Sequence, residues 1–278
     1  MFPCEDKNRS KIRRQYESQF TDSAELVDGS VEFLETLGKT ASNFSEETRA
    51  FLIGTFAREI RRFRSINLLC EFGLTENAEI LTRSGFEGLM SLHYVLGIRV
   101  PDDEISNDLK NRIRSLPEFP KDISKFDFRV ALYLAKEAQT YLKVFPDDGD
   151  KRKDEINYLK ELVGQVGEQW KKTIKDTKTY SGLNIRQLAE YCKLTDIYEE
   201  IYPLLCNVSH AGDASRFVGR NDDSEIVIKL VTDHTKIPPV LELSSLMLLK
   251  IVSAMEIGFD LVAPEVFGRF LQDRLPPS

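Results

Sequence analysis

The sequence is poor in the residues that build metal centres and disulfide frameworks. It has four cysteines and three histidines, and no two cysteines have the spacing of a zinc site or of a redox motif. Reduced thiols in a cytoplasmic protein are the simplest interpretation. Because the histidines are scattered along the chain, we expect no metal ion and no cofactor.

Motifs that identify common classes of enzyme are also absent. The chain has no P-loop, no dinucleotide-binding glycine pattern, no nucleophile elbow and no internal repeat. Residues 1–14 contain no apolar core of the kind found in signal peptides. The strongly apolar segment at 240–262 carries several charged residues, whereas a transmembrane helix would carry few or none. We therefore expect a cytoplasmic protein with no membrane partner.

Positive charge is not in excess. The net charge of −7 gives no global electrostatic argument for nucleic-acid binding, but it leaves room for a local basic face. One such face is predicted on a helix at 45–72, which carries Arg58, Arg61, Arg62 and Arg64. A charge run of this kind is most often a solvated helix face, and the alternative is a patch that binds phosphate groups.

What the sequence does contain is the pattern of a helical protein. Apolar residues recur at intervals of three and four, and glycines or prolines separate these segments. We predict a mostly all-α fold, a helical bundle, with a small β-hairpin or strand near 216–232. The predicted organisation is a polar N-terminal arm at 1–20, a single helical domain at 21–270 with an excursion at 100–125, and a loose tail at 271–278.

Two of the predicted helices have features that suggest a particular packing. Residues 151–177 carry a narrow apolar seam, as in a long helix that packs on a bundle or pairs with a second copy of the chain. Core packing is the commoner explanation, and a homo-oligomer is the alternative. Residues 195–210 predict a helix that is kinked at Pro203.

The helix predicted at 77–97 is apolar on nearly every side, so we expect it to be buried. Beyond its first turn its only formal charges are Arg83 and Glu87, which are four residues apart and can form an ion pair. The pair is either an internal one that fixes the helix in place or part of a site that lines a cleft. Gly85 and Gly88 lower the helix propensity and suggest close approach by another helix.

A second group of polar residues is predicted at the end of the kinked helix. His210 would lie near the helix C-terminus, where the helix dipole favours the imidazolium, and it titrates near neutral pH as a general acid or base must. Tyr202, Asn207 and Ser209 would supply hydrogen-bonding groups beside it, and Arg216 would add positive charge. The alternative is a histidine that only caps the helix.

These two groups carry a resemblance to a known family. The segment LTRSGFEGLMSLHYVLG at 81–97, with Tyr202 and CNVSHAG at 206–212, resembles a family of uncharacterised, mostly helical bacterial proteins. That family pairs a Leu-x-Arg-x-x-x-Glu helix with a later Tyr…Ser-x-x-His helix and a short strand-forming region. The resemblance covers about half of the chain, and it implies a bacterial, cytosolic, all-α protein of no settled activity.

This chain departs from the family pattern at the serine. Asn207 or Cys206 stands where the family often has serine, and Ser209 is instead adjacent to His210. The departure affects the hydrogen-bonding group nearest to the histidine, while the arginine, the glutamate and the histidine themselves match.

A weaker resemblance is to helical HEPN-type domains, whose ribonucleases use an Arg-x4–6-His motif on one helix. No arginine precedes His210 within six residues, so Arg83 would have to substitute from another helix. On this hypothesis His210 is the acid and base, and Arg83 stabilises the phosphorane charge. Arg58, Arg61 and Arg62 would guide the RNA backbone, without a metal ion.

The preferred prediction is a binding, regulatory or accessory protein of a bacterial defence or stress system, such as phage defence. It would act through a polar pocket around Arg83, Glu87 and His210, with RNA or a nucleotide as the candidate ligand. The alternatives are a HEPN-like ribonuclease and a structural oligomer without catalysis. The sequence leaves open whether the protein is an enzyme.

Overall fold

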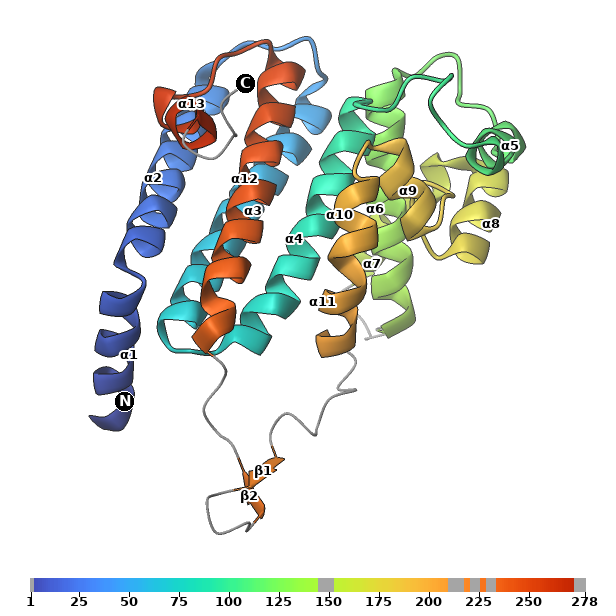
Figure 1. The fold of residues 1–278 in the computed structure, drawn as a ribbon. Coiled ribbons are helices and arrows are strands. Elements are labelled where there is room, and N and C mark those ends of the chain that lie inside the picture. The colour runs from blue at the N-terminus through green and yellow to red at the C-terminus, as the bar shows by residue number, and fades with distance from the viewer. Residues whose placement is uncertain (1–2, 145–152, 210–217, 221–225, 229–233, 273–278) are drawn as a thin grey trace. The chain divides into compact units, whose positions relative to one another are not determined.

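The structure is a computed structural model that describes residues 3–144, 153–209, 218–220, 226–228 and 234–272. Helices dominate these residues (Figure 1), which confirms the prediction of an all-α protein. Two three-residue strands, β1 (Val218–Arg220) and β2 (Ile226–Ile228), pair antiparallel with Gly219 opposite Val227. None of the described helices has the length and apolar character needed to cross a membrane.

The described helices begin and end as follows. They are α1 (Pro3–Gln15), α2 (Glu17–Lys39), α3 (Glu46–Glu71), α4 (Thr75–Leu96), α5 (Asn107–Ser115), α6 (Lys125–Val144), α7 (Lys153–Gln165), α8 (Gly167–Thr177), α9 (Ile185–Tyr191), α10 (Thr195–Glu200), α11 (Tyr202–Ser209), α12 (Ile237–Phe259) and α13 (Glu265–Gln272). A short 3-10 turn, His234–Lys236, comes directly before α12.

Contacts within the chain divide it into two compact units. Unit 1 contains residues 1–41, 53–89 and 199–278, and unit 2 contains residues 42–52 and 90–198. The division falls within α3 and α4, so each of these helices contributes to both units. A single domain can contain two such units, so the predicted single domain at 21–270 stays a prediction.

The core of unit 1 is built around α12. Its apolar side chains, among them Leu241, Leu248 and Val252, are buried. It packs along α2, beside which it runs in Figure 1. Prolines lie in its first turn, where a missing backbone amide costs no helical hydrogen bond. Phe33 of α2 and Phe56 of α3 meet edge to face, with ring centroids 6.0 Å apart, and extend the same core.

The polar N-terminal segment is helical and belongs to unit 1. Ile12 of α1 is buried in one cluster with Ile66 and Ile237. Arg9 forms an ion pair with Glu71 at the end of α3, with 2.5 Å between Nη2 and Oε2. The segment predicted as a polar N-terminal arm therefore contains the helix α1, which packs on the rest of unit 1.

In unit 2 the predicted long helix at 151–177 is two helices. Gly167, which begins α8, has a φ of +73°, a conformation that glycine adopts without steric cost. The buried seam residues pack with residues of α6 in one cluster: Val166, Trp170 and Ile174 with Phe128, Leu132 and Ala135. Core packing within the chain therefore accounts for this part of the seam.

The helix predicted at 195–210 is also divided. Because α10 ends at Glu200 and α11 begins at Tyr202, Pro203 lies in the first turn of α11. Proline is tolerated there, whereas inside a helix it removes a hydrogen bond and clashes with the preceding turn. The sequence predicted a kink, and the structure has an interruption between two short helices instead.

Candidate functional site

The candidate site lies on α3 and α4, which a short turn joins. Gly73 follows α3 with a φ of +74°, as expected for a glycine that terminates a helix. Within unit 1 the two helices are neighbours, since Nη1 of Arg62 in α3 donates a hydrogen bond to the carbonyl oxygen of Ser84 in α4 at 3.1 Å. The two helices therefore form a helical hairpin.

The predicted pair of Arg83 and Glu87 is present in α4, and Tyr202 of α11 completes it. Nε of Arg83 lies 3.3 Å from Oε1 of Glu87. The hydroxyl of Tyr202 donates to the same oxygen at 2.9 Å and accepts a hydrogen bond from Nη2 of Arg83 at 3.3 Å. The guanidinium also lies over the Tyr202 ring, 5.2 Å from its centroid. One phenol therefore holds both charged groups.

This cluster opens to solvent rather than lying sealed in the core. The side chain of Arg83 is 21% exposed and that of Glu87 is 43% exposed, whereas Tyr202 is buried against Phe86. Burial raises the pKa of Tyr202, and the negative charge of Glu87 raises it further. Burial lowers the pKa of Arg83, but the hydrogen bond to Tyr202 and the nearby negative groups raise it by more. The phenol stays protonated and the guanidinium stays charged.

Of the predicted downstream residues, Tyr202 is the one whose side chain the structure describes, and it lies at this pair. The other predicted members lie outside the described residues or have side chains outside them: His210, Arg216, Asn207 and Ser209. The predicted meeting of Arg83 with His210 therefore stays a prediction.

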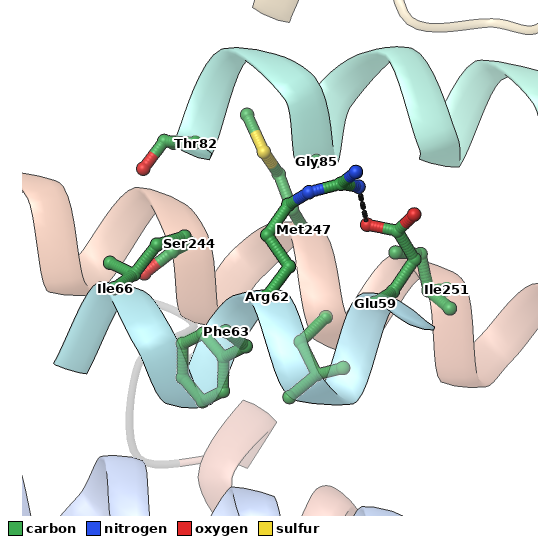
Figure 2. Close-up of a pocket in the computed structure, with 10 residues that line it drawn as sticks. Glu59, Arg62, Phe63, Ile66, Thr82, Gly85, Ser244, Met247 and Ile251 are labelled. Atoms are coloured by element: carbon green, nitrogen blue, oxygen red, sulfur yellow. Dashed lines mark hydrogen bonds and ion pairs between the residues drawn. The ribbon is translucent and has the colours of Figure 1, made fainter. Parts of the chain in front are cut away.

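A second charged network lies on α3, and sequence reasoning missed it. Glu59 is buried, with only 2% of its side chain exposed, and it forms an ion pair with Nη1 of Arg62 one turn along the helix. Nε of Arg58 lies 3.3 Å from the other carboxylate oxygen. Figure 2 shows Arg62 and Glu59 joined by this ion pair, with Arg62 extending from α3 towards Gly85 of α4.

The glycines of α4 make room for this network. A Cβ atom on Gly88 would lie 2.3 Å from Oε1 of Glu59, which is far inside van der Waals contact, and one on Gly85 would lie 3.7 Å from Cδ of Arg62. The expectation that these glycines allow a close approach is confirmed. What approaches Gly88 is a carboxylate, so the signal in the sequence was the one acid in the middle of α3, between its two ends, opposite paired glycines in α4.

The network changes the interpretation of the arginine cluster. Arg61 and Arg64 are exposed, as a solvated face requires, but Arg62 is turned inward to Glu59 and to the backbone of α4. This corrects the expectation that all four arginines surround one solvated face. Burial raises the pKa of Glu59, and the charges of Arg62 and Arg58 offset part of that rise.

Beside this network is a small cavity between α3, α4 and α12. Glu59, Arg62, Thr82 and Ser244 contribute polar groups, and apolar side chains such as Met247 form the rest (Figure 2). Its volume is about 20 Å³, which is room for about one water molecule. The cavity is therefore part of the packing and is too small for an organic ligand.

Neither charged group resembles a metal centre. Among the residues that the structure describes, no group of three or more His, Cys, Asp or Glu side chains is placed to hold a metal ion. His93 of α4 has its Nδ1 3.1 Å from the carbonyl oxygen of Cys192 within unit 2. That bond fixes the imidazole to the backbone and leaves Arg83, Glu87 and Tyr202 as the candidate site.

A family model matches residues 49–225, and its description is a family of unknown function, DUF5677. The chain belongs to this family. The match covers most of α3, all of α4 and α11, and β1, so it contains Arg83, Glu87, Tyr202 and His210. It confirms the prediction of a domain of unknown function. No curated protein and no solved structure matches the chain.

Proposed function

We propose that this DUF5677 protein is a binding protein with a regulatory or accessory role, and that Arg83, Glu87 and Tyr202 recognise its ligand. The observation that carries this proposal is the half-exposed ion pair held on both sides by one buried phenol. In a structural pair of this exposure a third fixed contact adds little, because exposed ion pairs contribute only ~0.2–1 kcal/mol. In a binding site the same contact has a use.

In a binding site, the contact with Tyr202 would fix the side chains of Arg83 and Glu87 before a ligand binds. A side chain that is already immobile loses little conformational entropy on binding, and this loss otherwise costs about 0.5–1.5 kcal/mol for each long side chain. The guanidinium over the Tyr202 ring and the carboxylate beside it would present a cation next to an anion. A nucleotide or RNA carries phosphate oxygens and amino or hydroxyl donors that suit both groups.

The biological setting is also part of the proposal. The proposed setting is a bacterial defence or stress system, in which the protein would have a regulatory or accessory role. His210 follows α11 directly in the sequence, and we include it as a further ligand contact.

The test is a titration with defined probes. A fluorescein-labelled single-stranded RNA is followed by fluorescence anisotropy, and AMP and ATP by calorimetry. Arg83→Met should weaken the binding of at least one probe by about tenfold, which corresponds to about 1.4 kcal/mol. The matched control is Arg99→Met, because Arg99 also pairs with an acid, Asp102, and lies 6.0 Å from a tyrosine ring centroid. Equal losses in both variants, or no binding by the wild type, would contradict the proposal.

The ribonuclease alternative is separated in the same experiment. Arg83 is already engaged by Glu87 and Tyr202, so stabilising a phosphorane would require it to exchange these partners. The labelled RNA is incubated in EDTA with the wild type and with His210→Ala. Cleavage by the wild type alone would replace the binding proposal with catalysis, and intact RNA in both samples would support binding.

A further inference from the structure

Unit 2 carries a concentration of lysines that the sequence analysis did not single out. In α8, Lys171, Lys172 and Lys175 lie on neighbouring turns. In α6, Lys136 and Lys143 are seven residues apart, so they lie two turns apart on one side of that helix. The helices α6 and α8 pack together through the buried cluster of Trp170 described above. The lysines of both helices are therefore brought to one region of unit 2.

A groove connects them. It is lined by residues of α6, α7 and α8: Gln139, Leu142, Lys143, Val163, Glu168, Lys171, Lys172 and Lys175. Its volume is about 470 Å³, which falls in the range of about 300–1,000 Å³ that small-molecule sites occupy. The half-buried Leu142 and Val163 supply its apolar surface, and Lys172 and Lys175 are exposed. The groove is thus large enough for a ligand, unlike the cavity beside Glu59.

Positive charge in this groove exceeds what nearby acids neutralise. In the described part of the chain, Glu168 pairs with Lys171, with 2.6 Å between Oε1 and Nζ, and Glu137 acts on Lys136. Lys136 lies on α6 outside the lining of the groove; burial lowers its pKa, and the charges of Lys143 and Lys178 lower it further. An anion bound beside Lys143 would offset part of this repulsion. The contrast is sharp in a protein whose net charge is −7.

We infer that this groove between α6 and α8 binds a small ligand that carries several phosphate groups in a row. Lysine ammonium groups act as point charges for phosphate oxygens, and a chain of phosphates places several negative charges within the length of one groove. A single carboxylate or phosphate would meet only one or two of the lysines. The inference concerns residues of unit 2 only, so it does not depend on the function proposed for Arg83, Glu87 and Tyr202.

The experiment uses the full chain with inorganic tripolyphosphate and with ATP as separate probes. Trp170, the only tryptophan, lies in α8 next to Lys171, so its fluorescence reports binding, and calorimetry gives the affinity. Lys172→Gln with Lys175→Gln should weaken tripolyphosphate binding by about tenfold or more, because two charge-assisted contacts are lost. The control with the same change in net charge is Lys39→Gln with Lys121→Gln, two exposed lysines outside the groove.

The outcomes distinguish the source of the phosphates. Equal affinity for both probes would support recognition of the phosphate chain alone, and tighter binding of ATP would support a nucleoside polyphosphate. The inference is overturned if neither probe binds, or if the groove variant and the control variant lose affinity equally. It is also overturned if a single-stranded RNA binds in a manner sensitive to the groove variant while both small probes do not, since the surface would then recognise nucleic acid.

Discussion

Two arginine–glutamate pairs in unit 1 lie on neighbouring helices and differ chiefly in their acids, since the side chain of Glu59 is 2% exposed and that of Glu87 is 43% exposed. The pair of Glu59 and Arg62 in α3 is enclosed, its carboxylate lies against Gly88 of α4, and its acid has a raised pKa. The pair of Arg83 and Glu87 in α4 is partly exposed and shares a tyrosine hydroxyl. The first pair has the features of a structural element, and the second has those of a recognition site.

The difference shows that apolar neighbours in the sequence do not identify which ion pair is buried in the fold. The apolar surroundings of Arg83 in the sequence suggested burial, yet the most enclosed carboxylate belongs to the helix with the most arginines. What decides burial is the facing surface, here two glycines that leave space for a carboxylate. Substitutions in each pair test the difference between them.

The largest effect is expected for Arg62→Met. The change removes the main partner of Glu59 and leaves a buried charge that only the longer contact to Arg58 compensates, which should lower the free energy of unfolding by up to about 3–5 kcal/mol at neutral pH. Urea unfolding followed by circular dichroism measures it. The loss should shrink as the pH falls towards the raised pKa of Glu59, because protonation removes the uncompensated charge. If Arg62→Met loses less stability than Arg83→Met at neutral pH, the structural role belongs to the Arg83 pair and not to the Arg62 pair.

Gly88→Ala should have the next largest effect. The new methyl group would displace the carboxylate of Glu59, and overpacking of this kind costs about 1–3 kcal/mol. The matched control is Gly54→Ala in α3, where a Cβ would meet nothing within 4 Å, and there the gain in helix propensity should stabilise the protein by up to about 1 kcal/mol. The midpoint temperature of thermal unfolding should fall for Gly88→Ala and rise for Gly54→Ala. A shift of both midpoints in the same direction would refute the close contact between Gly88 and Glu59.

A carboxylate of unit 2 sharpens the comparison, because hydroxyl groups hold it in place of arginines. Asp127 accepts hydrogen bonds from Thr48 and Ser124 at 2.6 Å each, and a further one from Ser45. Burial raises its pKa, but these bonds lower it by more, so its pKa lies below the usual 3.8. Glu59 and Asp127 are therefore shifted in opposite directions.

Asp127→Asn should cost about 1–2 kcal/mol at neutral pH, since bonds to a charged acceptor are stronger than those to an amide. A lowered folded pKa stabilises the protein above the unfolded value of 3.8, and this contribution is lost as the pH falls through 3.8 to the folded pKa. The difference between variant and wild type should therefore narrow in acid, as measured by urea unfolding across a pH series. If the difference in the free energy of unfolding instead widens in acid, the ionised form of Asp127 is not the form that the fold stabilises.

The smallest effect on stability is expected for Arg83→Met. Its ion pair is partly exposed, and pairs of this kind contribute less than about 1 kcal/mol. Urea unfolding of this variant should lie close to that of the wild type while its ligand affinity falls. A loss of stability as large as that of Arg62→Met would make the Arg83 pair structural as well.

Local signals in the sequence were sufficient for much of the fold. Gly73 marked the end of α3, and the spacing of Arg83 and Glu87 placed both on one face of α4. The breaks at Gly167 and before Pro203 were harder to predict, because apolar periodicity continues across both. A helix that stops for one residue and resumes keeps its buried face, so the pattern of apolar residues changes little.

The site was less predictable because it depends on contacts between distant segments. Tyr202 joins Arg83 across more than one hundred residues of sequence, and only packing brings α11 to α4. The position of the Glu59 carboxylate depends on the absence of a side chain at Gly88 of the next helix. Periodicity assigns a face to a residue, but it does not say what lies opposite that face.

The division of the chain also has a consequence for its synthesis. Unit 2 is complete once residue 198 has been made, whereas unit 1 needs its last segment, 199–278, which contains α12. Domains generally fold as they emerge from the ribosome, N-terminal parts first, and exposed apolar surface invites aggregation in the meantime. Until α12 has been synthesised, the apolar faces of α2 and α3 lack a packing partner. The first residue of α12 comes more than two hundred residues after the first residue of α2. A nascent chain stalled before α12 should therefore have a protease-resistant unit 2 and depend on chaperones to keep α2 and α3 soluble.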